Sequence, residues 1–346
     1  MDAQTWAESI IGRVLAGRYS IEGLLGMGGM GAVFRAVHLG LSRTVAVKLL
    51  VPKLVDDDNA VRRFQREAQA ASAASRRGVT EVLDFDVDPV CGPFLAMELL
   101  QGESLAARLR RDGRLAPAEA IHIARTMLDT LAAVHAQGIV HRDLKPGNVF
   151  LSVDAAGQRE VKLLDFGLVR LIRQEHHTQL TRPGAVLGTP AFMSPEQVRG
   201  ESDVDHRTDL YAVGALLYTC LSGRRPFEGL PADILTAVVT KRPAPLRPLC
   251  PGLPDGVYGV VERAMSRDRT LRFPDARTML DALDAAGRSP VATSVPPGVR
   301  DAPAAASRPP ELRESAAAPA AAPSVPLQPP VQPARPSGVR RATSRP

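Results

Sequence analysis

The chain of 346 residues contains no apolar stretch of about 18 residues, so we expect no transmembrane helix. It has only three cysteines, Cys91, Cys220 and Cys250, which lie far apart. That spacing excludes a disulfide scaffold and a CxxC metal site, and it suits a reducing cytoplasm. No basic segment precedes the short apolar run near the amino terminus, which argues against a signal peptide. We therefore expect a cytoplasmic protein without a membrane segment.

An excess of basic over acidic residues is confined to one part of the chain. Residues 288–346 hold eight arginines and only three acidic residues, whereas the remainder holds 35 basic and 34 acidic residues. The rest of the chain is thus nearly neutral. The net charge of +6 is weak support for nucleic-acid binding, and we expect no nucleic-acid partner.

The carboxy-terminal segment, residues 287–346, is rich in proline, alanine and arginine and contains no Phe, Tyr or Trp. Such a segment buries too little apolar surface to offset its ordering entropy, so we expect a disordered tail. Overlapping PxxP spacings would suit a partner that binds polyproline II helices, although a plain solvated tail fits the composition better. These spacings come from Pro326, Pro329, Pro330, Pro333 and Pro336.

The order of predicted elements divides the remainder into two parts. Short apolar or β-branched runs predict strands at 19–25, 32–37, 44–50 and 94–99. A helix is predicted at 59–75, with Asn59 as its N-cap. Helical periodicity predicts a helix that begins at Pro117 and stops at Gly138, and later helices at 210–221, 232–239, 257–265 and 275–285. The pattern indicates an antiparallel sheet followed by a helix-rich region.

A glycine-rich stretch lies between the first two predicted strands. It follows the G-x-G-x-x-G pattern and consists of Gly26, Met27, Gly28, Gly29, Met30, Gly31, Ala32 and Val33. A dinucleotide fingerprint would need a helix directly after the glycines, and a Walker loop would need Gly-Lys-Ser/Thr, but neither pattern is present. The stretch predicts either a strand–turn–strand flap whose N–H groups approach nucleotide phosphates or an ordinary hairpin.

Lysine is rare here, with five lysines among 43 basic residues. One of them, Lys48, ends the run VAVK, in which strand alternation places Ala46 and Lys48 on one face. A small residue beside a compact positive charge suits a nucleotide base next to its phosphates. Glu67, on the following predicted helix, would hold Lys48 in place, and ordinary surface residues are the alternative interpretation at both positions.

Three further motifs follow in order. Residues 141–148 read HRDLKPGN, residues 162–167 read KLLDFG and residues 194–196 read SPE. Together with the glycine-rich stretch and Lys48, this set resembles the signature of the protein kinases. It is most similar to the bacterial eukaryotic-like serine/threonine kinases over about residues 18–285. The resemblance implies an α+β, bilobal fold with an antiparallel β-rich N-lobe and a mainly helical C-lobe.

The resemblance implies catalytic roles for four residues. Asp143 would orient the substrate hydroxyl and accept its proton, and Lys145 would neutralise the γ-phosphate. Lys48, paired with Glu67, would contact the α- and β-phosphates. The implied reaction is transfer of the ATP γ-phosphoryl group to Ser or Thr hydroxyls of protein substrates.

The resemblance also implies the nucleotide and metal contacts. Asn148 and Asp165 would hold Mg²⁺, which prefers oxygen ligands, so ATP and Mg²⁺ are the expected cofactors. The adenine pocket would add Ala46, Met97, Glu98 and Leu100, the last two through hinge backbone groups.

The segment 168–195 resembles an activation loop. Arg142, directly before Asp143, is typical of kinases controlled by phosphorylation of that loop, because a phosphate there pairs with the arginine. We expect autophosphorylation at Thr181, with Thr178 second.

Three more residues match the scaffold of the family. Asp209 resembles the aspartate that anchors the backbone of the catalytic loop, and Glu196 and Arg272 resemble a buried ion pair. One segment departs from the pattern, because residues 75–80 replace the usual His-Pro-Asn turn after the Glu67 helix. The departure touches no catalytic atom and leaves the positioning of that helix open.

The expected organisation is an N-terminal extension (1–17), a kinase domain (18–286) and the tail (287–346). Within the domain we expect an N-lobe at about 18–98, a hinge at about 99–102 and a C-lobe at about 103–286. Some relatives dimerise through the N-lobe, which makes a homodimer a further expectation. The alternatives are a pseudokinase scaffold that binds nucleotide without transfer and a small-molecule kinase of related fold. The first would be marked by loss of Lys48, Asp143, Asn148 or Asp165, all of which are present.

Overall fold

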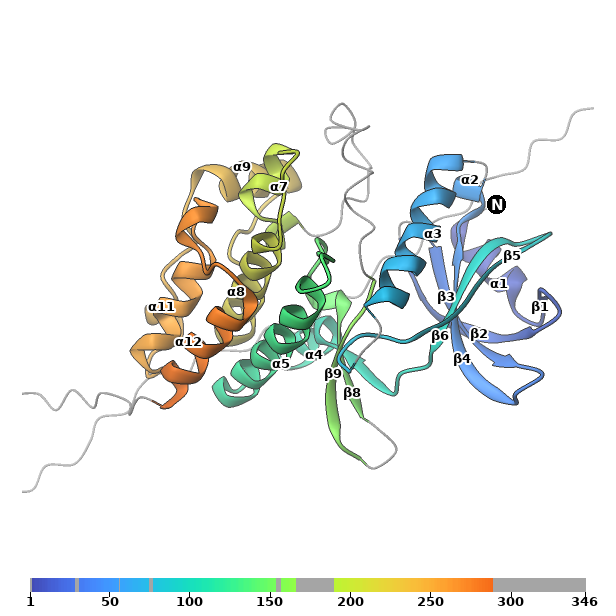
Figure 1. The fold of residues 1–346 in the computed structure, drawn as a ribbon, viewed down its shortest axis with the longest axis horizontal. Helices are drawn as coiled ribbons and strands as arrows, with labels where there is room; N and C mark the ends of the chain where they lie inside the picture. The colour runs from blue at the N-terminus through green and yellow to red at the C-terminus, as the bar shows by residue number, and fades with distance from the viewer. Residues whose placement is uncertain are drawn as a thin grey trace, which may run out of the picture. The chain divides into compact units, whose positions relative to one another are not determined.

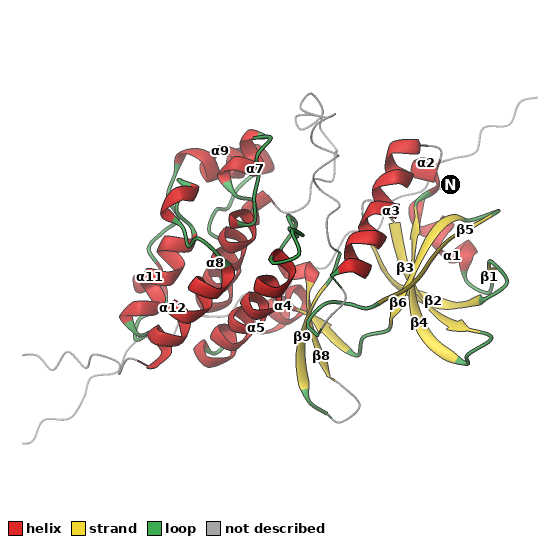
Figure 2. Ribbon diagram, viewed as in Figure 1, coloured by secondary structure: helices red, strands yellow, loops and turns green. Residues whose placement is uncertain are grey.

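The computed structural model describes residues 2–28, 31–55, 57–74, 77–153, 157–165 and 190–288, without the side chains of Arg63 and Glu67. Figures 1 and 2 show a twisted sheet with one long helix, α3, followed in the chain by a region built mainly of helices. This arrangement confirms the predicted α+β fold with a β-rich N-lobe and a helical C-lobe. All but the first two residues of the predicted tail, 287–346, lie outside the described residues.

Within the described residues, the N-lobe sheet has six antiparallel strands in the order β1-β2-β3-β4-β6-β5. Their bounds are β1 Val14–Leu15, β2 Tyr19–Met27, β3 Gly31–His38, β4 Arg43–Leu50, β5 Val82–Asp88 and β6 Gly92–Glu98. The sequence predicts β2, β3, β4 and β6 but neither β1 nor β5. A strand, not a helix, follows the glycine-rich stretch, since β2 and β3 pair along their length.

One face of this sheet packs against helix α1 (Ala3–Ile10). Trp6 of α1 lies edge-on to Phe34 of β3, with 6.4 Å between the ring centroids. The buried cluster on this face includes Val47 and Leu49 of β4. Residues 3–10 of the expected N-terminal extension therefore contribute to the core of the N-lobe.

The opposite face of the sheet packs against α3 (Asp58–Ala73), where Leu50 and Leu95 contact Phe64. The sequence prediction of Asn59 as the N-cap of this helix is wrong. The carboxylate of Asp57 caps it instead, accepting hydrogen bonds from the N–H groups of Asn59 at 2.9 Å and Ala60 at 3.2 Å. A carboxylate just before the first turn satisfies donors that have no partner inside the helix.

The C-lobe is built around α8 (Arg207–Ser222), in which residues 208–221 are all buried. The other α-helices that the structure describes after residue 102 are α4 Leu105–Asp112, α5 Pro117–His135, α7 Pro195–Arg199, α9 Pro231–Thr240, α10 Leu246–Leu249, α11 Asp255–Ala264 and α12 Ala276–Arg288. A short helix, α2 (Pro52–Val55), precedes α3 in the N-lobe. No helix in the described part of the chain combines the length and apolar character needed to cross a bilayer.

A small antiparallel sheet, in the order β7-β8-β9, carries the functional motifs. Its strands are β7 Gly102–Ser104, β8 Val149–Val153 and β9 Arg159–Leu163. A short 3-10 helix, η1 (Pro146–Asn148), leads into β8. A single parallel bridge between Val79 and Leu163 joins β9 to the segment that follows α3. The hairpin β8–β9 thus runs from the end of the HRDLKPGN motif into the KLLDFG motif. It also contacts Val79, in the segment that follows α3.

Candidate active site

The β8–β9 hairpin brings the HRDLKPGN and DFG motifs together. Asn148 directly precedes β8, and Asp165 follows the end of β9 by two residues. Because Val149 and Leu163 are paired in register, the two motif ends lie at the same end of the hairpin. A backbone hydrogen bond of 2.9 Å from the Leu164 N–H to the Asn148 carbonyl fixes this arrangement.

Asp143, Lys145 and Asn148 form a compact polar cluster. The Asp143 carboxylate oxygen Oδ2 accepts hydrogen bonds from Lys145 Nζ at 2.6 Å and from Asn148 Nδ2 at 2.9 Å. Asn148 Nδ2 also donates to the Asp143 carbonyl at 2.8 Å. The side chains of Asp143 and Lys145 keep 22% and 29% of their surface exposed. The cluster therefore offers a solvent-accessible carboxylate beside a cation.

Asp209 of α8 holds the backbone that carries this cluster. Its carboxylate accepts hydrogen bonds from the N–H groups of His141 and Arg142, both at 2.8 Å, and from His135 Nε2 at 2.8 Å. Burial pushes the pKa of Asp209 upward, but the hydrogen bonds and charge of its partners outweigh burial and leave the pKa below its ordinary value. This geometry confirms the predicted anchoring role.

Arg142 adopts a left-handed backbone conformation, with φ of 66°. Residues other than glycine seldom adopt this conformation, and it costs of the order of 1–3 kcal/mol. The two hydrogen bonds to Asp209 and a third, from Gln197 Nε2 to the Arg142 carbonyl at 2.7 Å, hold the backbone in place. The loop before Asp143 is thus held by α8 and α7.

His141 links the two motifs through its imidazole ring and is completely buried. Its Nδ1 accepts a hydrogen bond from the Asp143 N–H at 3.3 Å, so Nε2 carries the proton and donates to the Leu164 carbonyl at 2.8 Å. The ring therefore positions Asp143 relative to the residue before Asp165. Motif spacing gives no sign of this role of His141, since spacing along the chain does not reveal a contact across the fold.

Lys48 reaches Asp165 from the N-lobe. Its Nζ lies 2.8 Å from Asp165 Oδ1, and the Lys48 side chain is 9% exposed. Asp165 has a φ of 53°, a second left-handed residue at the site. Strained backbone at two motif positions is typical of functional sites, because the surrounding contacts must hold it.

The strand register places the other expected nucleotide contacts on the Lys48 face of the sheet. Val33 is opposite Lys48, and Ala46 is opposite Met97. Directly opposed residues on neighbouring antiparallel strands project to the same side, and residues two apart on one strand share that side. Val33, Ala46, Lys48 and Met97 therefore share one face of the sheet.

The described glycines of the glycine-rich stretch, Gly26, Gly28 and Gly31, differ in whether close packing requires glycine. At Gly31 a Cβ would come within 2.1 Å of the Leu49 carbonyl oxygen, so close strand packing requires glycine there. A Cβ at Gly26 would meet nothing within 4 Å. Gly28 donates its N–H to the Gly31 carbonyl at 2.8 Å and so closes the turn. A Cβ at Gly28 would meet only the Gly31 carbonyl oxygen, at 3.9 Å, so neither Gly26 nor Gly28 is required by close packing, as expected where a ligand approaches the backbone.

Glu98, the last residue of β6, connects the expected hinge to β9. Its Oε1 accepts hydrogen bonds from Lys162 Nζ at 3.0 Å and from the Glu81 N–H at 2.8 Å. The Glu98 N–H donates to the Glu81 carbonyl at 3.0 Å, so an adenine contact from Glu98 would have to use its carbonyl. Leu100, half-buried, follows two residues later. Lys162 thus links β9 to the end of β6, a role that the sequence alone does not predict.

Several predicted site features lie outside the described residues. They are the side chain of Glu67 and the residues Gly29, Met30, Thr178 and Thr181. Glu67 is placed only as a backbone position within α3. The Lys48–Glu67 pair and the phosphorylation sites remain predictions.

The residues expected to bind Mg²⁺ fit that ion. Among the described residues no three His, Cys, Asp or Glu side chains gather as a metal site. Mg²⁺ does not need such a cage, since one or two protein oxygens plus substrate phosphates suffice. Asn148 uses its amide nitrogen to bond Asp143, and its amide oxygen accepts no hydrogen bond from the described residues. That oxygen and the Asp165 carboxylate are the two ligand atoms of the required kind.

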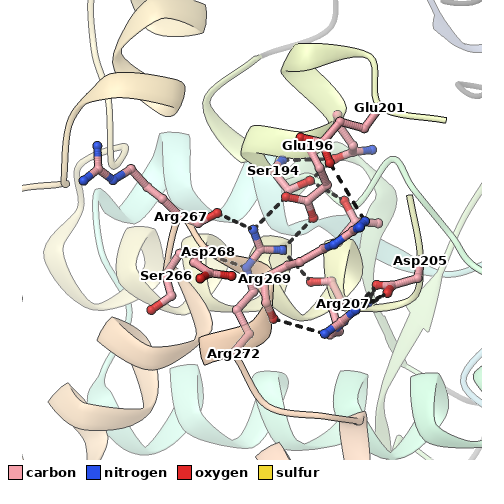
Figure 3. A network of polar contacts seen from close by, with 12 residues as sticks. Ser194, Glu196, Glu201, Asp205, Arg207, Ser266, Arg267, Asp268, Arg269 and Arg272 are labelled. Carbon is pink, nitrogen blue, oxygen red and sulfur yellow. Dashed lines mark hydrogen bonds and ion pairs between the residues drawn. The ribbon is translucent and has the colours of Figure 1, made fainter. Parts of the chain in front are cut away.

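Glu196 and Arg272 form the buried ion pair predicted from the sequence (Figure 3). Two hydrogen bonds of 2.6 and 2.7 Å join the guanidinium to the carboxylate, and the two side chains are 0% and 3% exposed. Arg272 also donates to the carbonyls of Ser266 at 2.8 Å and Arg207 at 3.1 Å. The pair therefore fixes α7 against the segment between α11 and α12.

The family model described as "Protein kinase domain" matches residues 19–247. The Myxococcus xanthus protein "Serine/threonine-protein kinase pkn2" is 40% identical over 278 residues, covering 79% of this chain and 33% of that relative. "Serine/threonine-protein kinase PknA" of Mycobacterium tuberculosis is 35% identical over 296 residues, covering 83% of this chain and 66% of the relative. The chain thus spans between one third and two thirds of the length of these relatives.

A solved structure shows the same likeness. The Mycobacterium tuberculosis PknI kinase domain superposes with a TM-score of 0.63 at 27% identity, covering 80% of this chain and 98% of that one. Sequence and fold comparisons therefore agree with the motif geometry. The chain belongs to the family of bacterial eukaryotic-like serine/threonine protein kinases.

Proposed function

We propose that this chain transfers the γ-phosphoryl group of ATP to Ser and Thr hydroxyl groups of other proteins. The observation that carries the proposal is the cluster of Asp143, Lys145 and Asn148 at one end of the β8–β9 hairpin, with Lys48 paired to Asp165 beside it. Phosphoryl transfer needs positioning and positive charge more than covalent chemistry from the protein. The cluster supplies both kinds of group.

Asp143 is the residue that would receive the proton of the substrate hydroxyl. Its carboxylate is partly exposed, and Lys145 and Asn148 hold it by hydrogen bonds. Proton transfer to a positioned base contributes about 10²- to 10⁴-fold to a rate. Lys145, whose ammonium lies 2.6 Å from this carboxylate, would also offset the negative charge that develops on the transferred group.

Asn148 and Asp165 are the proposed holders of Mg²⁺, and Lys48 is the proposed contact for the phosphates of ATP. When bound, Mg²⁺ neutralises charge on the phosphate oxygens. Lys48 is almost completely buried on β4, which is paired on both sides, and its ammonium contacts Asp165, so these contacts would hold the ammonium in place before ATP binds. The pseudokinase alternative is disfavoured, because Lys48, Asp143, Asn148 and Asp165 are all present in matching motifs.

Finer features of the function are also proposals. Autophosphorylation at Thr181, with Thr178 second, would order the loop through Arg142. A cytoplasmic location is supported by Cys91, Cys220 and Cys250, which are free and buried. A homodimer formed through the N-lobe is proposed from family resemblance alone.

The experiment that tests the proposal is transfer of label from γ-labelled ATP to a basic acceptor protein by the purified full chain. We expect label on serine and threonine, dependent on Mg²⁺ and abolished by a chelator. Peptide mapping of the labelled chain would locate the autophosphorylation sites. The proposal would be contradicted if label appeared on tyrosine alone. It would also be contradicted if the protein bound nucleotide and carried phosphate on its activation loop but transferred no label.

A further inference from the structure

A large cavity lies within the C-lobe, and none of the proposed catalytic or nucleotide-binding residues lines it. Its volume is about 980 Å³. Its walls come from α7, α8 and α9, the segment 241–246 after α9, α11 and the short 3-10 helix η3 (Arg269–Leu271). Cavities of this size are large enough to enclose most of a drug-sized ligand.

Two tyrosines of α8 line this cavity. Tyr211 is 1% exposed and Tyr218 is 2% exposed, yet neither hydroxyl forms a hydrogen bond with any described residue. Neither hydroxyl is among the described side-chain atoms that lack both solvent contact and a partner, so both hydroxyls reach the open space of the cavity. Burial raises the pKa of both phenols, so both keep their protons and remain donors. The cavity is therefore lined by two donors that the protein itself leaves unused.

The charged residues around the cavity are mainly basic. Six basic and four acidic side chains line it, and one of the acidic ones, Glu196, is neutralised by Arg272. Most of the basic residues have partners, for example Arg267, which donates to the Thr240 carbonyl at 2.8 Å. Lys241 and Arg242 are exposed and have no partner among the described residues. These two cations are the part of the rim most available to a ligand.

The cavity adjoins α7, the helix that supports the catalytic loop. Glu196 and Arg199 of α7 line it, while the intervening Gln197 donates a hydrogen bond of 2.7 Å to the Arg142 carbonyl. Arg142 directly precedes Asp143. A ligand in the cavity would therefore contact the same short helix that holds the loop carrying the proposed catalytic carboxylate.

We propose that this cavity binds an acidic segment of a protein substrate. In the substrate's sequence, this segment is separated from the residue that is phosphorylated. The inference rests on the proposed kinase function and adds to it a basis for choosing substrates. Carboxylates would accept hydrogen bonds from Tyr211 and Tyr218 and would pair with Lys241 and Arg242. The two tyrosines are seven residues apart on one helix, about 10 Å along its axis, which an extended peptide spans with about three residues.

A binding measurement without nucleotide tests this inference. The probes are a fluorescein-labelled Glu-Asp-Glu-Asp-Glu-Asp peptide and its Gln-Asn-Gln-Asn-Gln-Asn counterpart, titrated with the full chain. We expect the acidic peptide to bind at least about tenfold more tightly, with an affinity that falls as salt rises. Equal affinity for the two peptides would overturn the inference.

Variants locate the binding site. The double substitution Lys241→Ala/Arg242→Ala is expected to weaken binding of the acidic peptide about tenfold, and Tyr218→Phe to weaken it several-fold. The matched control is Arg110→Ala/Arg114→Ala, which removes the same charge from exposed residues that do not line the cavity. Unchanged binding in the Lys241/Arg242 variant, or equal weakening in the control, would show that the peptide binds elsewhere.

A kinetic measurement connects the cavity to substrate choice. Two reporter peptides share one serine acceptor and carry either an acidic or a neutral extension. We expect a lower KM for the acidic peptide, and the Lys241/Arg242 variant should abolish that advantage. Peptide binding by a protein that transfers no phosphate would contradict the kinase function while leaving the cavity assignment intact. Transfer without any preference for the acidic peptide would overturn the inference alone.

Discussion

Lys48 and Asp165 form an ion pair of 2.8 Å, although 117 positions separate them in the sequence. The lysine comes from strand β4 of the N-lobe sheet, and the aspartate follows β9 of the small sheet. A cation and a carboxylate from two separate sheets thus meet at one point. In the proposed reaction the first contacts phosphates and the second holds the metal that binds them. Their contact means that the two halves of the proposed phosphate-binding site are already together.

Substitution of Lys48 by methionine should abolish most phosphoryl transfer. Methionine keeps the length and apolar stem of lysine but lacks the charge directed at the phosphates. We expect the rate to fall at least about 100-fold in steady-state assays with γ-labelled ATP. The control is Lys53→Met on α2, an exposed lysine away from the site, which should keep its rate. Comparable losses in both variants would contradict the role given to Lys48.

Substitution of Asp209 by asparagine should impair the catalytic loop. Both carboxylate oxygens of Asp209 accept hydrogen bonds, so an amide NH₂ group would face a donor on one side. We expect a loss of about 2–4 kcal/mol in the free energy of unfolding and a fall in kcat, with ATP affinity changed little. Denaturant unfolding and steady-state kinetics measure the two effects. Asp233→Asn, at an exposed position of α9, is the control and should change neither.

The Glu196–Arg272 pair should contribute strongly to stability. Arg272→Met would leave a buried carboxylate without its partner, at a cost of about 3–5 kcal/mol in the free energy of unfolding. The control is Arg277→Met, which breaks an ion pair with Asp129 whose side chains are 64% and 71% exposed and should leave the melting temperature unchanged. Similar melting temperatures for the two variants would contradict a structural role for the buried pair.

The same pair should make stability depend on pH. Burial raises the pKa of Glu196, but the hydrogen bonds and charge of Arg272 outweigh burial and leave the pKa below its ordinary value of 4.5. A carboxyl group with a lowered pKa in the folded state stabilises the protein above pH 4.5, and this contribution is lost as pH falls toward the folded-state pKa. The difference in stability between the unchanged protein and Arg272→Met should therefore narrow below that pH. A constant difference between pH 7 and pH 3 would contradict this assignment.

Gly78→Ala should destabilise the contact between the segment after α3 and the C-lobe. Gly78 has a φ of +89°, and a Cβ there would lie 2.2 Å from Thr130 Oγ1 on α5. Its carbonyl accepts the Leu163 N–H at 2.8 Å, so a shift would also disturb the chain leading to Asp165. We expect a loss of about 2–4 kcal/mol in the free energy of unfolding.

The control for Gly78 separates the clash from backbone strain. Gly138 has a φ of +74°, but nothing lies within 4 Å of a Cβ placed there. Gly138→Ala should therefore cost only about 1–2 kcal/mol, the cost of left-handed backbone. Equal losses in the two variants would show that the contact with Thr130 is unimportant.

The predicted strands and helices with clear periodicity agree with the structure, whereas elements that break the usual preferences do not emerge from the sequence. Strand β5 contains three aspartates, which disfavour strands. The fold stabilises them through distant partners. Tyr19 donates to Asp84 at 2.8 Å, and the Ala16 N–H donates to Asp88 at 2.9 Å. Because these partners lie 65 and 72 positions away in the sequence, the local pattern alone does not predict this strand.

Helix α1 shows a similar limit. Trp6, Ala7 and Ile10 form its buried face, but the helix is only eight residues long. A helix this short is marginal without tertiary packing, so the sequence suggests only an extension. Packing against Phe34 provides the missing stabilisation.

In the candidate site, too, the sequence alone predicts some residues and misses others. The residues that bear the chemistry, such as Lys48 and Asp143, are found from motif order and spacing. The residues that position them are less visible, because their roles depend on contacts across the fold. His141 bonds Leu164, and Lys162 bonds Glu98 across 64 positions. Motif spacing indicates the proposed reacting groups, while three-dimensional contacts identify the residues that hold them.

The decisive measurement for the proposed function compares the unchanged protein with Asp143→Asn, recording ATP affinity and phosphoryl transfer on the same samples. Asparagine is nearly isosteric but does not accept the proton of a substrate hydroxyl. We predict nearly unchanged nucleotide binding and a fall of about 10²- to 10⁴-fold in transfer to serine and threonine. Transfer that persists at the original rate in Asp143→Asn would contradict the assignment of Asp143 as the base.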